Sequence, residues 1–189
     1  VAALLHAAGS ARQRDGTHRN PCRWCAVIAA DLVVLGERSE LELLAPALAI
    51  ALAAKCAERA ALVITLLADG APRRRWAAPA SAAAARFRDQ LADQGVVAGA
   101  RGRLVTTDCA GESAVATAER LIATAQLPVV IVALRPRDEQ LDALIAAAQR
   151  VVVARSGDAE LERLAIEQIA ALGVDAELLD PPPSAAARF

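Results

Sequence analysis

Residues 129–173 read VVIVALRPRDEQLDALIAAAQRVVVARSGDAELERLAIEQIAALG. Two short runs rich in valine, 129–134 and 151–154, are each followed by a longer stretch whose apolar residues recur at helical spacing. The short runs predict buried strands, and the stretches 139–149 and 159–172 predict helices. Because strands that alternate with helices are typical of a parallel sheet with crossover connections, this segment predicts an α/β domain.

The second of these helices carries a regular apolar stripe. Ser156-Gly157-Asp158 is predicted to turn the chain into this helix, and Gly173 is predicted to end it. The spacing predicts that one face of the helix packs against the sheet. That face comprises Leu161, Leu164, Ala165, Ile169 and Leu172.

The same alternation extends toward the N-terminus. Strands are predicted at 31–36, 61–67 and 103–107, and a short edge strand at 176–179. Helices are predicted at 44–59, 80–94 and 113–125, with Pro46 in a first turn, Gly95 as a C-terminal cap, and Glu112 and Ser113 preparing the third helix.

The pattern as a whole predicts a three-layer α/β fold. We expect a mostly parallel sheet of five or six strands with alanine-rich helices on both faces. The chain divides into a loop-rich lead-in over 1–26, a single domain over 27–179 and a proline-rich tail over 180–189. With 189 residues, the chain is long enough for one domain with a substantial core.

Composition predicts a soluble protein. Hydrophobic residues make up 56% of the chain, but charged or polar residues interrupt every apolar run before the ~20 residues that a membrane-spanning helix needs. Arg12 and Arg14 follow the apolar start instead of preceding it, which is the reverse of a secretory signal, so a cytoplasmic location is expected. The net charge of −1 does not favour nucleic acid or an anionic membrane as the main partner.

The charges are nevertheless unevenly distributed. Residues 70–103 are rich in arginine and residues 156–189 are rich in acids, which indicates either two solvated faces or two surfaces that attract each other. Candidate partner-binding residues on a surface loop are Arg73, Arg74, Arg75 and Trp76. The arginine-rich segment 73–103 is also the basis of an alternative hypothesis, nucleic-acid binding.

The carboxyl ends of the strands are the predicted location of a ligand crevice, because open parallel sheets bind ligands there. Candidate residues in the loops after the strands are Gly36, Glu37, Arg38, Ser39, Asp108, Arg135 and Ser156. The first of these loops fails the phosphate-binding pattern GxxxxGK[ST], since Leu41, Glu42 and Leu43 stand where Gly, Lys and Ser/Thr are required.

Neither metal nor cofactor chemistry is predicted. Cys22 and Cys25 form a lone CxxC and are the only candidate metal ligands, but a structural zinc ion needs four ligands and no second such pair exists. His6 and His18 are the only histidines and both lie in the lead-in, so no catalytic triad is expected. Cys56 and Cys109 are predicted to be packing residues.

Residues 129–172 resemble the C-terminal half of ParA/MinD-like P-loop ATPases, and residues 31–59 match the opening strand, loop and helix of that family in order. The family's magnesium-associated acid is replaced by Ala133 or Leu134. The resemblance implies a fold relative that has lost ATP hydrolysis. A rival resemblance links residues 32–67 to universal stress proteins, but the glycine-rich ATP segment of that family is missing.

These observations favour a non-enzymatic protein that binds another protein and has no cofactor. The alternative functions are small-molecule or nucleotide binding, or an enzyme, at the strand-end crevice, and nucleic-acid binding through residues 73–103.

Magnesium–ATP should show no saturable binding at submillimolar concentration. The loop that follows the first strand offers Glu37, Glu40 and Glu42 in place of the lysine that neutralises phosphates. Isothermal titration calorimetry checks this expectation, and saturable heat accompanied by hydrolysis would contradict it.

Overall fold

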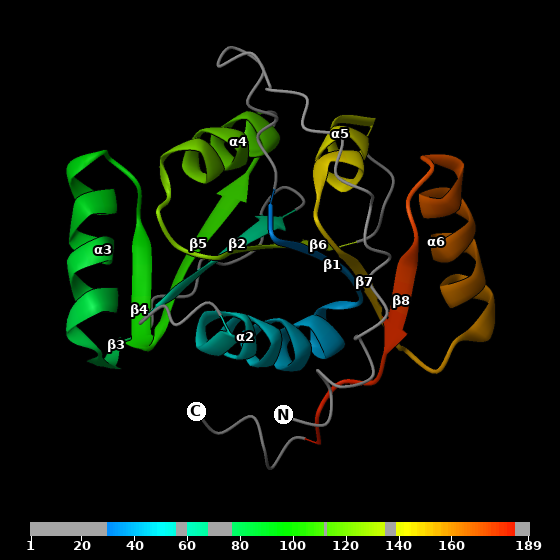
Figure 1. The fold of residues 1–189 in the computed structure, drawn as a ribbon, viewed down its shortest axis with the longest axis horizontal. Coiled ribbons are helices and arrows are strands. Elements are labelled where there is room, and N and C mark those ends of the chain that lie inside the picture. The colour runs from blue at the N-terminus through cyan, green and yellow to red at the C-terminus, as the bar shows by residue number, and fades with distance from the viewer. Residues whose placement is uncertain (1–29, 56–59, 68–76, 112, 135–138, 184–189) are drawn as a thin grey trace, which may run out of the picture.

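One mixed sheet runs through the computed structural model, which describes residues 30–55, 60–67, 77–111, 113–134 and 139–183 (Figure 1). Its strands are β1 (Leu32–Gly36), β2 (Ala61–Leu67), β3 (Ala77–Ala80), β4 (Ala98–Gly102), β5 (Leu104–Ala110), β6 (Val129–Leu134), β7 (Val151–Ala154) and β8 (Ala176–Leu179). Its helices are α2 (Arg38–Lys55), α3 (Ala82–Asp93), α4 (Ala114–Thr124), α5 (Glu139–Ala147) and α6 (Ala159–Ala171).

The strands lie in the order β3-β4-β5-β2-β6-β1-β7-β8. All neighbouring pairs are parallel except β4 and β5, which form an antiparallel hairpin. The described side chains of the central strands β1, β6 and β7 are buried, apart from Gly36 at the end of β1, as expected for a parallel sheet covered on both faces. The prediction of an α/β fold with a mostly parallel sheet is confirmed.

The two faces of the sheet are covered unequally. Helix α2 packs on one face, where Leu41, Leu44 and Leu48 meet the inward side chains of the central strands. Helices α3, α4, α5 and α6 all contribute to the core on the other face. Figure 1 shows α2 below the sheet and α4 and α5 above it. Helices on both faces were predicted, but their division between the faces was not.

Hydrogen bonds of Asp31 connect the amino ends of three strands, β1, β6 and β7, that are far apart in the sequence. Its carboxylate accepts hydrogen bonds from the backbone N–H of Val129 at 2.8 Å and from the side-chain amide of Gln149 at 3.3 Å. Its own N–H donates to the carbonyl of Val129 at 3.1 Å. These bonds align the amino ends of β1 and β6 with the chain that leads into β7.

The sheet has more strands than the five or six predicted. The structure has eight strands, and the two that were not predicted are β3 and β4. The strand predicted at 103–107 corresponds to β5, which extends to Ala110. The sequences of the two missed strands, AAPA and AGARG, contain only alanine, glycine, proline and arginine, which have little intrinsic preference for strands. Strand β4 forms by pairing with β5, and β3 forms by pairing with β4.

Helix α2 was predicted at 44–59, but it begins at Arg38, directly after β1. Residues 38–43, predicted to be a polar loop, therefore form its first turns. Pro46 lies inside the helix and not in its first turn, so the prediction for this residue was wrong. Proline lacks the N–H that would bond to residue 42, but alanine and leucine packing on the sheet holds the helix together at this point.

Other local signals match the structure closely. Strands β6, β7 and β8 have the predicted bounds, and Gly95 and Gly173 end their helices with φ of +76° and +75°. Ser113 is the N-terminal cap residue of α4, but its side chain makes no capping hydrogen bond, contrary to prediction. Among the described residues, no helix is long and apolar enough to cross a membrane.

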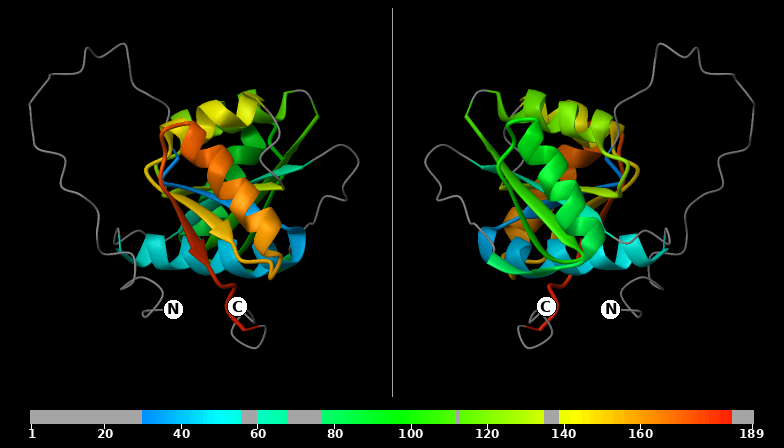
Figure 2. Two further views of the ribbon diagram at one scale, coloured as in Figure 1. Left: turned by 90° about the vertical axis from the view of Figure 1, so that its right-hand side faces the viewer. Right: turned by 90° about the vertical axis from the view of Figure 1, so that its left-hand side faces the viewer.

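The acidic and basic segments lie at opposite edges of the sheet. Helix α6 and β8 form one edge, and β3, β4 and α3 form the other (Figure 2). The described parts of these segments therefore lie far apart within one molecule.

Gly36 allows a close approach between β1 and β7. A Cβ atom built on Gly36 would lie 2.8 Å from the Cβ of Ala154. Real Cβ atoms do not come this close, so a larger residue at either position would push the two strands apart at their carboxyl ends.

The variant Gly36→Ala should unfold with a free energy about 1–3 kcal/mol lower than wild type because of this clash. Adding Ala154→Gly should bring the stability back close to that of wild type, because the double variant only moves the glycine from β1 to its neighbour β7. Urea denaturation of the single and double variants provides the measurement. Equal stability of Gly36→Ala and wild type would refute the steric argument.

Candidate functional site

The connections that leave β1 and β7 run in opposite directions. After β1 the chain passes through α2 to β2, and after β7 it passes through α6 to β8, which lies on the other side. Because β1 and β7 are neighbours, the two connections diverge and leave a crevice at the carboxyl ends of these strands. This is the topological position at which open α/β sheets bind ligands.

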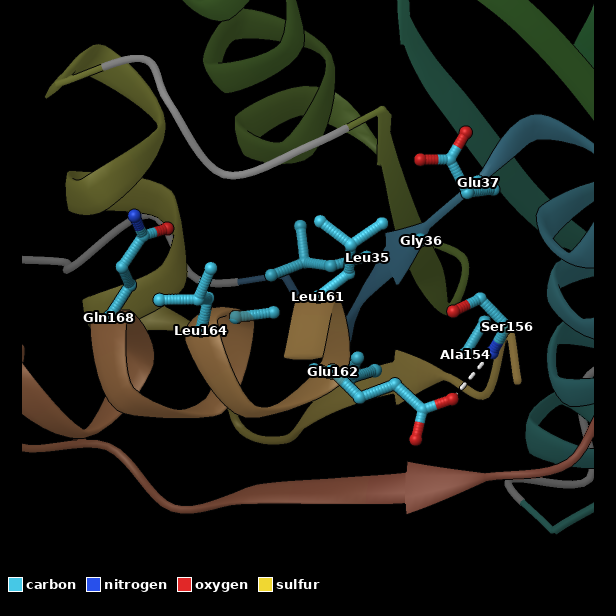
Figure 3. Close-up of a pocket in the computed structure, with 11 residues that line it drawn as sticks. Leu35, Gly36, Glu37, Ala154, Ser156, Leu161, Glu162, Leu164 and Gln168 are labelled. Carbon is cyan, nitrogen blue, oxygen red and sulfur yellow. Dashed lines mark hydrogen bonds between the residues drawn. The ribbon is translucent and has the colours of Figure 1, made fainter. Parts of the chain in front are cut away.

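A pocket of about 100 Å³ occupies this crevice (Figure 3). Strands β1 and β7 supply its inner wall and α6 supplies one side. Most of the lining is apolar, and the polar groups are two carboxylates, a hydroxyl and an amide. The lining residues are Leu35, Gly36, Glu37, Val153, Ala154, Ser156, Leu161, Glu162, Leu164, Ala165 and Gln168.

Glu162 occupies the anion-binding position of the crevice. This buried residue of α6 reaches back to the turn after β7, where one carboxylate oxygen accepts the N–H groups of Ser156 at 2.8 Å and Gly157 at 2.9 Å. Two successive backbone N–H groups that converge on one oxygen form a typical anion-binding nest. The chain's own carboxylate therefore takes the place that a phosphate oxygen would take in a nucleotide site.

The helix that follows has a conventional cap. Asp158 accepts hydrogen bonds from the N–H groups of Glu160 at 3.1 Å and Leu161 at 3.2 Å. Asp158 and Glu162 together satisfy four backbone donors at the entry to α6. An incoming anion would meet two carboxylates there and few available N–H groups.

The predicted inward face of α6 is wrong at two positions, and the prediction missed one buried residue. Leu161 and Leu164 are 44% and 40% exposed, whereas Glu162 is only 9% exposed. Ile169 is buried as predicted, and Ala165 and Leu172 are partly buried against the core. Because α6 lies at the edge of the sheet, the strands cover only part of its apolar stripe, and its first two leucines border the pocket instead (Figure 3).

The sequence contained only a partial signal for Glu162. A capping box places its acidic residue three positions after the cap residue, and Glu162 comes four positions after Asp158. The left-handed Gly157, with φ of +82°, shapes the turn so that the nest opens toward this carboxylate. A search for acids that follow a Ser-Gly-Asp turn by one helical turn would have found it.

Three of the predicted crevice residues lie together. Gly36, Glu37 and Ser156 line the pocket, and the hydroxyl of Ser156 accepts the N–H of Asp158 at 3.2 Å. Arg38 and Ser39 are exposed and lie outside the lining. The guanidinium of Arg38 pairs with Glu42 at 3.3 Å, and the hydroxyl of Ser39 donates to Glu40 at 2.7 Å.

The remaining predicted site residues are elsewhere. Asp108 lies on β5, in register with Thr65 of β2, and β2 and β6 separate it from β1. At the usual strand spacing, this separation is roughly 14 Å. Residues outside the described part of the chain are Arg135, the partner-binding candidates Arg73, Arg74, Arg75 and Trp76, and the cysteines Cys22, Cys25 and Cys56. Cys109 is buried in the core, as predicted.

The electrostatics beside the pocket are acidic. Arg163 of α6 donates hydrogen bonds to both Glu160 and Glu167, so two carboxylates share one guanidinium. The pKa of Glu160 lies below its usual value because of the hydrogen bond and the positive charge of Arg163. The pKa of Arg163 is raised by its hydrogen bonds to Glu160 and Glu167. Two glutamates and one arginine give this cluster a formal net charge of −1.

The pocket lining offers few polar groups. The pocket lining contains no histidine, cysteine or lysine, and its only hydroxyl is already used in the turn before α6. No group of three or more His, Cys, Asp or Glu able to hold a metal ion occurs within the described ranges. The lining therefore offers an apolar surface with two carboxylates and one amide.

Comparison with protein-family models, with curated proteins and with solved structures gave no match for this chain.

Replacing Glu162 with alanine should lower the free energy of unfolding by about 1–3 kcal/mol, because the two N–H groups lose their acceptor. Formate, the smallest carboxylate, should then raise the melting temperature of Glu162→Ala by filling the vacated nest, and should have little effect on wild type. Thermal unfolding with and without formate is the measurement. Glu167→Ala, an exposed acid on the same helix, serves as the control and should not respond to formate. An equal response of all three proteins would show that Glu162 does not occupy an anion site.

Proposed function

We propose that this protein is a non-catalytic α/β domain that acts by binding another protein at the crevice between β1 and β7. One observation carries the proposal: the crevice has an exposed apolar lining, but its anion-binding N–H groups are already occupied by Glu162. The site keeps the position of a nucleotide pocket and lacks the groups that would hold a phosphate.

The size of the pocket also favours a protein partner. Pockets for cofactors and drug-sized ligands measure about 300–1,000 Å³. At about 100 Å³, this pocket is smaller than an engineered cavity of ~150 Å³ that holds one benzene molecule. It suits a single side chain, and side chains seated in such pockets often dominate protein–protein interfaces. These magnitudes argue against the small-molecule alternative at this crevice.

Descent from ParA/MinD-like ATPases is a second part of the proposal. It rests on the order of strands and helices and on the residues that replace the nucleotide motifs. A pseudo-ATPase of this kind would retain the crevice and use it for recognition. The proposed protein-binding function does not depend on this relationship.

A photoactivatable cross-linking residue tests the proposal in the cells that express the protein. Placed at Gln168, an exposed residue of the pocket lining, it should give discrete cross-links to another protein. Adding Leu161→Ser should abolish these cross-links, since this change removes part of the apolar wall. The same cross-linker at the exposed Asp93, at the opposite edge of the sheet, is the control. Identical products from Gln168 and Asp93, or none from Gln168, would contradict the proposal.

A further inference from the structure

Two leucines of α6 form an exposed apolar pair beside the pocket. Among the described residues, only Val97, Leu161 and Leu164 are large hydrophobic side chains with high exposure. Leu161 and Leu164 are one helical turn apart, and Figure 3 shows both side chains projecting from the same side of α6. The pocket and this pair therefore form one continuous apolar surface.

Acidic residues surround this surface. Over the described residues 150–183, seven acids stand against three arginines, and two of these, Arg150 and Arg155, pair with Glu177 and Asp180. Glu160 lies four residues before Leu164, and Glu167 lies three residues after it. Both glutamates form ion pairs with the same residue, Arg163. Glu37 and Glu162 belong to the pocket lining itself. The field at this edge therefore attracts positive charge and repels negative charge.

The pocket also limits the kind of side chain that can enter. Its walls are aliphatic, formed largely by Leu35, Val153, Leu161, Leu164 and Ala165. A volume of about 100 Å³ is smaller than the ~150 Å³ of a closed cavity that holds benzene, which favours a side chain smaller than an aromatic ring. A leucine, isoleucine or valine side chain matches both the size and the chemistry.

We infer that the crevice between β1 and β7 receives an aliphatic side chain from a positively charged segment of a partner protein. The apolar pair Leu161 and Leu164 packs against the same segment, and the acids of α6 attract its lysines or arginines. This inference rests on the proposed function and specifies the chemistry of the partner. The charge complementarity between an acidic rim and a basic segment of a partner protein is the reason for choosing this occupant.

Selection from a displayed library of random 12-residue peptides against the full chain tests the inference. Enriched peptides should carry a net positive charge and at least one leucine, isoleucine or valine. The variant Leu161→Ser/Leu164→Ser should bind them at least about tenfold more weakly, because it removes exposed apolar contacts. Val97→Ser, which changes the third exposed hydrophobic residue at the opposite edge, is the matched control and should bind them as wild type does.

Charge is tested separately with Glu160→Gln/Glu167→Gln. This variant should bind the same peptides more weakly and lose part of the dependence of their affinity on salt concentration. A measurement on wild type makes the test independent of variant folding: methyl NMR signals of Leu161 and Leu164 should shift when an enriched peptide is added.

The outcomes separate the inference from the proposed function. Enriched peptides that require the leucines but are neutral or acidic would overturn the inference and leave protein binding at the crevice intact. If no enriched peptide requires the leucines or shifts their methyl signals, both fail. Wild-type protein should sediment as a monomer, and a dimer that Leu161→Ser/Leu164→Ser dissociates would identify a second copy as the occupant and overturn the inference.

Discussion

The parallel pairing of β1 with both β6 and β7 is the constraint on which the rest of the structure depends. These partners lie about a hundred residues further along the chain, and Asp31 joins the same segments through its hydrogen bonds to Val129 and Gln149. Once β1 is inserted between them, α2 must cross over β6 to reach β2. Helix α2 consequently lies across the centre of the sheet and covers that face without another helix among the described elements.

The same insertion creates the crevice. A strand placed between two others sends its connection to one side, and its neighbour β7 sends its connection to the other side. Gly36 and Ala154 permit the two strands to come close where they end, because neither carries a side chain larger than a methyl group. Both residues also line the pocket.

The position of α6 at the edge of the sheet explains both the burial of Glu162 and the exposure of two leucines. A helix over the middle of a sheet buries a wide apolar stripe, but a helix at the edge has strands beneath only part of its surface. Ile169 packs into the core, while Leu161 and Leu164 face the crevice. The carboxylate of Glu162 is stable in its buried position because two backbone N–H groups satisfy one of its oxygens. A nest that could hold a ligand's anion instead stabilises the entry to the helix.

Local signals in the sequence determined most of the elements. Valine-rich runs marked β6 and β7, and Gly95 and Gly173 marked the ends of two helices, since a left-handed backbone conformation favours glycine over all other residues. The strand-end location of the crevice also followed from the order of strands and helices, and it placed Gly36, Glu37 and Ser156 in one group. These features depend on neighbours within a few residues or on a general property of parallel sheets.

Only the tertiary structure decided the order of the strands, the presence of β3 and β4, and the surroundings of α6. The alanine and glycine residues of β4 form a strand because β5 supplies hydrogen-bonding partners, and no local preference indicates this. The periodicity of α6 identified its apolar residues correctly but could not determine which of them the sheet would cover. That depends on where the helix lies relative to the last strands, and therefore on pairings between residues that are far apart in the chain.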